Sequence, residues 1–401
     1  MTQPSSAPIH PAGPIYMDAH ATTPVDPRVL EAMLPFFTEH FGNPGSLHPY
    51  GWTAEAAVKQ ARATLAAAIH AEPEEIVFTS GATEANNLAI KGAAEAYFSS
   101  GKHIVTLQTE HSAILDPCRY LETLGFEVTY LPVQADGRVD LHVLDSAIRP
   151  DTILVSIMAA NNEIGVLQPL AAIGQICEQR NTLFHTDAAQ AIGKIPLDVR
   201  AMNIHLMSLT AHKVYGPKGV GALYVRRRNP RVQVAPQLHG GGQERGRRSG
   251  TLCPPQIVGF AQAIELGLAE MAAESVRLTR LRERLWQSLQ ALPDVFLNGH
   301  PTQRLPGNLN VSVAGLDGQA LLLGLRSVVA LSSGAACSST RTTPSHVLRA
   351  LGRSDGLAYA SLRFGLGRTT TAEEVEQVAQ AVIETVQSLR QLSPAQPIPQ
   401  P

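Results

Sequence analysis

The chain has 401 residues, of which 44% are hydrophobic, 5% aromatic and 16% charged, and its formal net charge is −2. That length is enough for a large hydrophobic core and for two domains. The nearly balanced charge excludes a chain whose whole surface attracts nucleic acid or an anionic membrane, so neither is an expected partner.

Membrane insertion, secretion and a disulfide framework are not expected either. No apolar run approaches the roughly 18 residues of a membrane-spanning helix, and the N-terminus lacks the basic start and apolar stretch of a signal peptide. The four cysteines, Cys118, Cys177, Cys253 and Cys337, form no CxxC pair. A cytoplasmic location, with its reducing conditions, is therefore the expected one.

The first half of the chain alternates short β-rich runs with helical stretches. Strands are predicted at residues 75–79, 103–107, 127–131, 152–158, 183–186, 205–209 and 221–225, and helices at 82–99, from about 114, at 140–148 and at 169–180. This alternation predicts an α/β fold, in which a mostly parallel sheet has helices on both faces.

From residue 256 the pattern changes to a long helical stretch that ends near residue 290. After it we expect strands at 295–298, 308–313, 328–331 and 362–365, and helices at 317–326, 345–351 and from 371, where Thr371 and Glu374 form a capping box. The sequence thus predicts a large domain over residues 15–262 and a smaller C-terminal α/β domain over 263–392, which part of the N-terminal segment could join. The Pro-, Ser- and Gln-rich ends, 1–14 and 393–401, are expected to be disordered tails.

Two predicted strands end in residues that suit one cofactor. Lys213 lies directly after an apolar run and before a Gly-Pro turn, a position that can present an amine for a Schiff base. Asp187 follows the predicted strand 183–186, where a carboxylate requires a partner. A pyridinium nitrogen is one such partner, and a helix cap is the simpler alternative. An amine and an acid of this kind are what a pyridoxal phosphate enzyme needs.

The segment Ser80–Asn87 lies between a predicted strand and a predicted helix. Its glycine permits a tight turn, the helix start at Ala82 supplies free N–H groups, and Thr83 adds a hydroxyl. These features predict a phosphate site, although an ordinary helix cap is the simpler alternative. Thr210 and His212, next to the lysine, could donate to the same phosphate, unless the histidine is only a core residue.

Three further polar residues near strand ends are candidate ring contacts. Gln190 could reach the phenolic oxygen of a pyridoxal ring. His111 could stack on the ring and move protons near neutral pH. Asn162 could contact the ring or a carboxylate. Taken singly, His111 and Asn162 are also explained by surface or loop chemistry.

Cys337 lies among small polar residues with nothing to pack against it. Because cysteine is usually buried, such a residue is either an accident or a nucleophile that has to move. The other cysteines have apolar or Pro-flanked neighbours and are expected to be packing residues. Arg363 lies inside an apolar strand, where it could hold a carboxylate bidentately or form an internal salt bridge.

Taken in order, these segments resemble the cysteine desulfurases, which are pyridoxal phosphate enzymes of the class V aminotransferase superfamily. The resemblance spans about residues 15 to 392 and is carried by Met17-Asp18, Ala21–Pro24, Asn43–Ser46, Phe78–Glu84, His111, Asn161–Gly165, Asp187, Gln190, His212-Lys213, Arg247–Thr251 and Ser332–Gly334 before Cys337. Pro344–Ala350, after a long cysteine loop, is similar to the iron–sulfur-cluster-assembly branch. The resemblance implies the aspartate-aminotransferase-like fold of type I and a homodimer with its active sites at the interface.

The resemblance also implies a role for each candidate residue. Lys213 would bind pyridoxal 5'-phosphate covalently and move the substrate's α-proton, and the thiolate of Cys337 would take the sulfur of L-cysteine as a persulfide, releasing L-alanine. The implied ring contacts are Asp187, Gln190, Asn162 and His111, which also assists proton transfer. The implied phosphate contacts are Ala82, Thr83, Thr210, His212 and, from the second subunit, Thr251. Arg363 and Asn162 would hold the substrate carboxylate.

Implied partners are L-cysteine, a second copy of the chain, and a sulfur-acceptor or scaffold protein. No resident metal is implied, although Cys337 could transiently contact an iron–sulfur cluster. The chain departs from the family in Thr210, where serine is usual, in Ala19-His20 after Asp18, and in a C-terminus without the longer extension that docks the scaffold. A selenocysteine lyase, another class V aminotransferase and a catalytically silent assembly scaffold are the alternatives.

Overall fold

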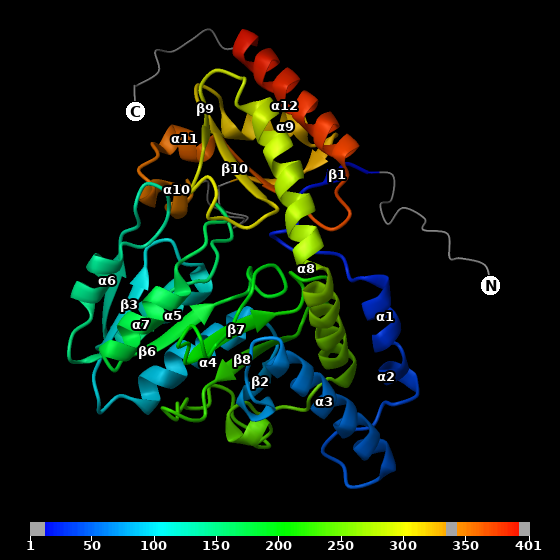
Figure 1. Ribbon diagram of the computed structural model, residues 1–401, viewed down its shortest axis with the longest axis vertical. Coiled ribbons are helices and arrows are strands. Elements are labelled where there is room, and N and C mark those ends of the chain that lie inside the picture. Colours follow the sequence, from blue (N-terminus) through cyan, green and yellow to red (C-terminus); the bar gives the residue numbers. More distant parts are fainter. Residues whose placement is uncertain (1–12, 334–342, 393–401) are drawn as a thin grey trace.

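The computed structural model describes residues 13–333 and 343–392. It consists of a large sheet with helices on both faces and a smaller sheet beside it, joined by one long helix (Figure 1). Apart from Gly13 and Pro14, the tails for which the sequence predicts disorder lie outside the described residues, and so does Cys337. No helix in the described ranges combines the length and the apolar character needed to cross a membrane.

The large sheet has seven strands in the order β2-β8-β7-β6-β5-β3-β4. They are β2 (Ile76–Thr79), β3 (His103–Leu107), β4 (Glu127–Leu131), β5 (Thr152–Ser156), β6 (Leu183–Asp187), β7 (Leu206–Thr210) and β8 (Gly221–Val225). Neighbours from β7 through to β4 run parallel, whereas β8 is antiparallel to both β7 and β2. The prediction of a mostly parallel sheet is confirmed.

Helices cover both faces of this sheet. On one face, α4 (Ala82–Ala96) and α5 (Ser112–Thr123) pack against the strands through residues that include Leu88, Ile114 and Cys118. The other face is covered by α3 (Pro49–Ala67), α6 (Leu141–Ala147), α7 (Leu170–Gln179) and the first half of α8 (Pro254–Leu289). Because both faces are covered, β5 to β8 are buried along their whole length.

The smaller sheet is antiparallel, with strand order β12-β13-β10-β9. Its strands are β9 (Val295–Leu297), β10 (Asn308–Val313), β12 (Ser332–Ser333) and β13 (Ser361–Gly365), and the helices nearby are α9 (Gly318–Leu325), α10 (His346–Ala350), α11 (Asp355–Tyr359) and α12 (Ala372–Leu392). The predicted capping box is confirmed, since Thr371 N donates to Glu374 Oε2 at 2.9 Å and Glu374 N donates to Thr371 Oγ1 at 3.2 Å.

One predicted strand has an unexpected partner. The run at 328–331 forms β11 (Val329–Ala330), which pairs in parallel with β1 (Ile15–Tyr16) and does not join the smaller sheet. Met17, next to β1, is fully buried in the hydrophobic core of the smaller sheet. The N-terminal segment therefore packs on the C-terminal part of the chain.

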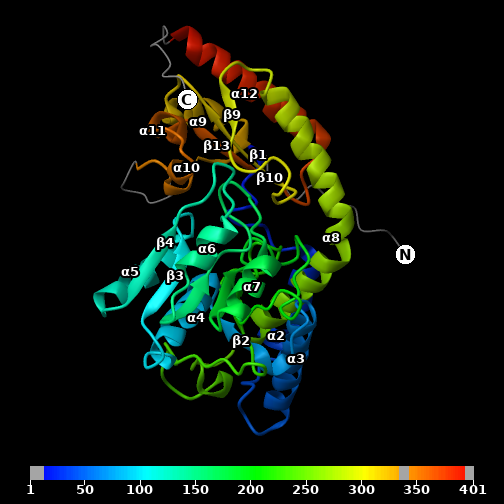
Figure 2. The same cartoon turned by 60° about the vertical axis from the view of Figure 1, so that its left-hand side comes forward.

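Helix α8 links the two hydrophobic cores. Its first half contributes Ile257, Phe260 and Ile264 to the core of the large sheet, and its second half contributes Leu278 and Leu285 to the core of the smaller sheet. Figure 2 shows α8 running along the side of both parts. The change of core falls between Ile264 and Leu278, beyond the predicted domain boundary at residue 262, which stays a proposal.

The sequence reasoning missed the N-terminal helices α1 (Pro27–Met33), α2 (Pro35–Thr38) and α3. Each begins with a proline in its first turn, where the missing N–H costs nothing. In α3, the buried residues recur at helical spacing, which is a signal that could have predicted it: Ala54, Val58, Ala61 and Leu65.

The expectation that Cys253 is a packing residue was wrong. Cys118 and Cys177 are buried within helices, as expected, but Cys253 is exposed. It occupies the N-cap position of α8, outside the helix itself. The prolines that follow Cys253 indicate where the helix begins, but they do not indicate whether Cys253 is buried.

Candidate active site

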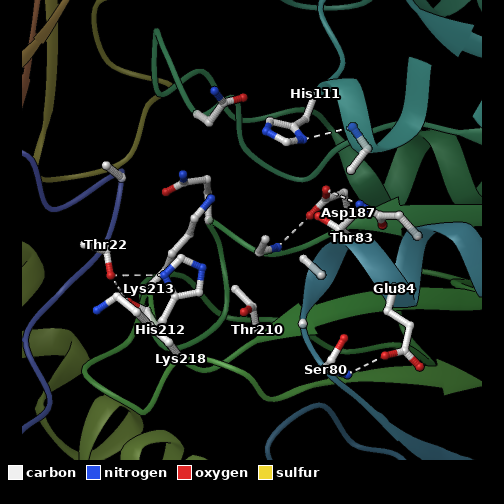
Figure 3. Close-up of a pocket in the computed structure, with 18 of the residues that line it drawn as sticks. Thr22, Ser80, Thr83, Glu84, His111, Asp187, Thr210, His212, Lys213 and Lys218 are labelled. Carbon is white, nitrogen blue, oxygen red and sulfur yellow. Dashed lines mark hydrogen bonds between the residues drawn. The ribbon is translucent and has the colours of Figure 1, made fainter. Parts of the chain in front are cut away.

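A cavity of about 600 Å³ lies where the carboxyl ends of β6 and β7 meet the start of α4. Parallel strands bring their carboxyl ends to one edge of a sheet, and open α/β sheets bind ligands at that edge. Figure 3 shows Lys213 and His212 on one side of the cavity, with Asp187, Thr83 and His111 on the other. The lysine and the acid singled out by the sequence therefore share one site.

Lys213 follows β7 in the turn toward β8. Burial lowers the pKa of its amine, the Asp187 carboxylate opposes part of that shift, and the Arg363 guanidinium adds to it. A lowered pKa increases the fraction of neutral amine near neutral pH. The neutral amine is the nucleophilic form, so this environment suits a lysine that bonds covalently to a carbonyl.

Asp187 is 7% exposed and has two partners within the chain. Its Oδ2 accepts from Asn86 Nδ2 at 2.7 Å, and its Oδ1 accepts from Ala189 N at 2.8 Å. Each carboxylate oxygen keeps a lone pair for a ligand in the cavity. Asn86 was missed by the sequence reasoning, although a fully buried amide within α4 requires such a partner.

The N-terminus of α4 opens onto the cavity. Gly81 precedes the helix at φ 156° and ψ −178°, a conformation that essentially only glycine adopts. Among the described residues, no side chain caps the first N–H groups of the helix, and Ala82 and Thr83 line the cavity together with Thr210. Free N–H groups at the positive end of a helix dipole suit a phosphate, so the predicted phosphate residues lie together.

His212 faces the same end of the cavity. Its Nδ1 lies 3.1 Å from Thr22 Oγ1, and burial, followed by the charge of Lys213, lowers the pKa of the ring to about 4. The ring is therefore neutral at neutral pH. The backbone carbonyl of His212 accepts from Thr23 Oγ1 at 3.0 Å, so the Thr22-Thr23 segment holds the turn after β7 in place. Neither threonine was predicted as a site residue; both lie in the Ala21–Pro24 motif.

His111 and Asn162 also line the cavity. His111 caps α5 because its Nδ1 accepts from Ala113 N at 3.0 Å, so the proton of the neutral ring is on Nε2. Asn162 Oδ1 is buried and has no partner among the described residues. Its neighbour Asn161 instead closes a turn by accepting from the backbone N–H of Glu163 and Ile164. Of the two asparagines, Asn162 is the one free to contact a ligand.

Arg363 forms the internal salt bridge that the sequence left open as an alternative. Its Nη2 donates to Asp18 Oδ1 at 2.8 Å, and its Nη1 donates to the carbonyl of Asn162 at 2.9 Å. Its Nε is buried and has no partner in the described part of the chain. Asp18 thus orients the guanidinium, and the Nε–H is left for a carboxylate.

Two predicted site residues that the structure describes, Arg363 and Thr251, do not line this cavity. Thr251 is exposed and lies outside the cavity of its own chain, and Cys337 lies outside the described residues. Across residues 13–333 and 343–392, no cluster of three or more His, Cys, Asp or Glu side chains could hold a metal ion.

A second, smaller cavity of about 40 Å³ lies between the two cores and is lined by residues that include His20, Lys194, Tyr215 and Glu274. Burial, followed by the charge of Lys213, lowers the pKa of Lys194 to about 7, while Glu274 opposes the shift. The sequence reasoning did not single out Lys194, since only the fold places its amine beside this interior space.

Comparisons with known proteins identify the protein family to which this fold and this site belong. The family model described as aminotransferase class-V matches residues 15–378, and the chain belongs to this family. It is 57% identical over 383 residues to a cysteine desulfurase of Mus musculus, covering 95% of this chain and 83% of the relative. It is 55% identical over 382 residues to cysteine desulfurase IscS of Methylococcus capsulatus, covering 95% and 94%. Within the family, the chain is a member of the cysteine desulfurases.

Solved structures agree with this fold. A NifS-like protein superposes with a TM-score of 0.87 at 38% identity, covering 94% of this chain and 100% of the other. A structure titled SspA in complex with cysteine superposes with a TM-score of 0.79 at 40% identity, covering 88% and 98%. The predicted fold of type I is therefore confirmed.

The lowered pKa of Lys194 gives a testable pH dependence. Between pH 7 and 9 the unfolded chain keeps the Lys194 proton, whereas the folded chain has lost it, so the folded state is stabilised as the pH rises. We expect the free energy of unfolding of the wild type to rise relative to Lys194→Met by up to about 1.4 kcal/mol per pH unit. Urea denaturation without added cofactor at several pH values measures this difference.

The exposed Lys218 provides the matched control. The difference in the free energy of unfolding between the wild type and Lys218→Met should stay constant over the same pH range. If the free energies of unfolding of the wild type and Lys194→Met change in parallel with pH, the pKa of Lys194 is not lowered by folding and the prediction is wrong.

Proposed function

We propose that this chain is a pyridoxal phosphate-dependent cysteine desulfurase. It converts L-cysteine to L-alanine and takes up the sulfur on Cys337 as a persulfide, for iron–sulfur cluster assembly or another acceptor. The observation that carries the proposal is the convergence of Lys213, Asp187 and the uncapped start of α4 on one cavity. Relatives named as cysteine desulfurases, and a similar structure whose title reports bound cysteine, support the choice of substrate.

The residues that line the cavity fit pyridoxal 5'-phosphate. Its phosphate would be held by the start of α4, with Ala82 and Thr83, and by Thr210 and His212. Its ring nitrogen would pair with Asp187, and its ring would lie near His111, Asn162 and Gln190. When bound, the cofactor supplies an electron sink for negative charge that develops on the substrate's carbon atoms.

The side chains of this chain would divide the remaining work. The amine of Lys213, whose pKa is lowered by burial, would accept the proton from the substrate's α-carbon and later return one. His111 presents Nε2–H toward the same space. Arg363 would hold the substrate carboxylate through its free Nε–H, and Asn162 would hold it through its amide N–H, since the amide oxygen only accepts. Each group is thus placed before the substrate arrives, which limits the entropy lost in the reaction.

Sulfur transfer requires a thiolate. The Cys337 sulfur forms an S–S bond to the substrate sulfur while the substrate's carbon–sulfur bond breaks, and the electron pair of that bond stays with the carbon. That carbon is then protonated, which yields L-alanine.

A selenocysteine lyase or a transaminase would use the same cavity. Added keto acid separates a transaminase from a desulfurase, because a transaminase passes the amino group to the keto acid, whereas a desulfurase makes alanine without it.

A homodimer is the proposed assembly. Large apolar side chains are exposed along residues 30–52, on α1, α2 and the segment that enters α3: Leu30, Leu34, Phe37, Phe41, Leu47, Tyr50 and Trp52. An exposed apolar surface of this extent is typical of a protein interface. A second copy on this surface would explain how Thr251, which misses the cavity of its own chain, could reach the cavity of its partner.

Lys213→Ala should abolish covalent attachment of the cofactor, because no other amine takes its place at the end of β7. Borohydride reduction followed by peptide mass spectrometry should find pyridoxal phosphate on the Lys213 peptide of the wild type. Lys218→Ala, a lysine at the rim of the same cavity, should keep the label. A labelled Lys213→Ala variant would refute the assignment.

Cys337→Ser should retain the cofactor absorbance. In an assay with a thiol reductant, which frees sulfide from the persulfide, it should lose sulfide release from cysteine by roughly 100-fold or more, because the hydroxyl is a far weaker nucleophile toward sulfur. The matched control is Cys253→Ser, since Cys253 is an exposed cysteine that should be dispensable. Mass spectrometry after cysteine treatment should find one added sulfur on the Cys337 peptide. Full turnover by Cys337→Ser would assign the nucleophile elsewhere.

The dimer makes a separate prediction. Phe37→Asp combined with Phe41→Asp should convert the protein to a monomer in sedimentation experiments and weaken its binding of pyridoxal phosphate, because the site loses the partner's Thr251. Leu124→Asp, which changes an equally exposed apolar residue at the end of α5, should leave the assembly intact. A wild-type monomer that binds the cofactor fully would contradict the proposed assembly.

A further inference from the structure

A buried histidine lies directly behind one wall of the active-site cavity. His20 is 3% exposed and Gln190, at the cavity wall, is 3% exposed. Two hydrogen bonds join them: Gln190 Nε2 donates to the carbonyl of His20 at 2.8 Å, and Gln190 Oε1 lies 3.2 Å from His20 Nδ1. The sequence marked His20 only as a departure from the family pattern.

These two bonds determine the hydrogen positions without ambiguity. A backbone carbonyl only accepts, so the atom of Gln190 that faces it must be the amide nitrogen. The other atom is then the amide oxygen, which also only accepts, so His20 Nδ1 must carry a proton and donate it. The imidazole is thereby the neutral Nδ1–H tautomer, and its Nε2 is an acceptor.

Protonation of the ring is opposed by its surroundings. The charged groups that act on His20 are Lys194, Arg363 and Lys213, all of which are positive. The smaller cavity adds Glu274 and Arg368, together with the phenol of Tyr215. Burial, followed by these positive charges, holds the pKa of His20 well below its usual value. The ring therefore stays neutral across the range in which the enzyme would work.

Within the described residues, the side chain of His20 makes its hydrogen bond through Nδ1, to Gln190 Oε1. His20 Nε2 is buried and has no partner in the described part of the chain, and a buried acceptor without a donor is destabilising. The bond from Nδ1 to Gln190 is therefore the side-chain contact through which His20 can act on the cavity wall.

We propose that His20 is a positioning residue of the cofactor site, which fixes the orientation of the Gln190 amide so that its second N–H is held for the pyridoxal ring oxygen. The carbonyl of His20 takes one N–H of the amide, and the imidazole blocks the flip that would exchange oxygen and nitrogen. The inference rests on the proposed function, since it needs a ring oxygen in the cavity.

The test compares variants that keep or remove the donor at the Nδ1 position. Asparagine places an amide N–H close to where histidine Nδ1 lies, whereas glutamine places it farther out and alanine has none. All of these variants keep the backbone carbonyl. The full chain is titrated with pyridoxal 5'-phosphate, and both the apparent Kd and the absorbance maximum of the bound cofactor are recorded between pH 6 and 9.

His20→Ala, His20→Gln and Gln190→Ala should each weaken cofactor binding by roughly 3- to 10-fold, the effect of one lost hydrogen bond, and should shift the absorbance maximum alike. His20→Asn should stay within about twofold of the wild type. The double variant His20→Ala with Gln190→Ala should bind as Gln190→Ala alone, because His20 acts only through Gln190. The ratio of wild type to His20→Asn should not change with pH.

A matched control separates positioning from stability. His103 is also fully buried, and its ring nitrogens bond to Thr152 and Thr129, far from the cavity. His103→Ala should lower the Tm without weakening cofactor binding. If His20→Ala does not fold, the comparison of His20→Asn with His20→Gln tests the same donor.

Three outcomes would overturn the proposal: unchanged binding in His20→Ala or His20→Gln, effects of His20→Ala and Gln190→Ala that multiply in the double variant, or a His20→Asn variant as weak as His20→Gln. A wild-type chain that binds no pyridoxal phosphate would instead remove the proposed function, and this inference with it. The two failures are therefore distinguishable.

Discussion

The site depends on a lysine amine and a carboxylate that are both withdrawn from water at the ends of neighbouring parallel strands. Burial lowers the pKa of the Lys213 amine, and the Asp187 carboxylate opposes part of that shift. Asn86 and the backbone of Ala189 hold the carboxylate in place, so it stays available to a cation or a ring N–H. The parallel pairing of β6 and β7 is what brings the two groups to one edge.

The remaining contacts of the site follow from that edge. Because β2 also ends there, the helix after it points its free N–H groups at the same space, and Gly81 makes the turn possible. Gly221, on β8, could not carry a side chain, since a Cβ there would lie 2.7 Å from the backbone of Gly81. The phosphate end and the amine end of the cavity are thus set by backbone geometry, and the polar side chains then determine which ligand fits.

The sequence predicted the seven strands of the large sheet, their mostly parallel arrangement, and the positions of Lys213, Asp187 and the α4 start at strand ends, because burial patterns and turn residues encode each of these locally. What it could not predict are partnerships between distant segments. Asp18 with Arg363, His20 with Gln190, and Asn86 with Asp187 each join residues more than 100 positions apart. No local pattern reports such a pair, since only the folded chain determines which buried polar group meets which. Lys194 was overlooked for the same reason.

Arg363 shows why substrate and cofactor make different demands on the fold. The proposed cofactor contacts within this chain come from the part built on the large sheet, whereas Arg363 is on β13 of the smaller sheet. Its guanidinium is oriented by Asp18, which also accepts from Ser332 Oγ at 2.9 Å. A buried Nε–H without a partner costs about 1–3 kcal/mol, and a substrate carboxylate would recover that energy. The proposed substrate binding therefore requires the two cores to hold a fixed position relative to each other. The proposed cofactor binding requires only the large core and the proposed partner subunit.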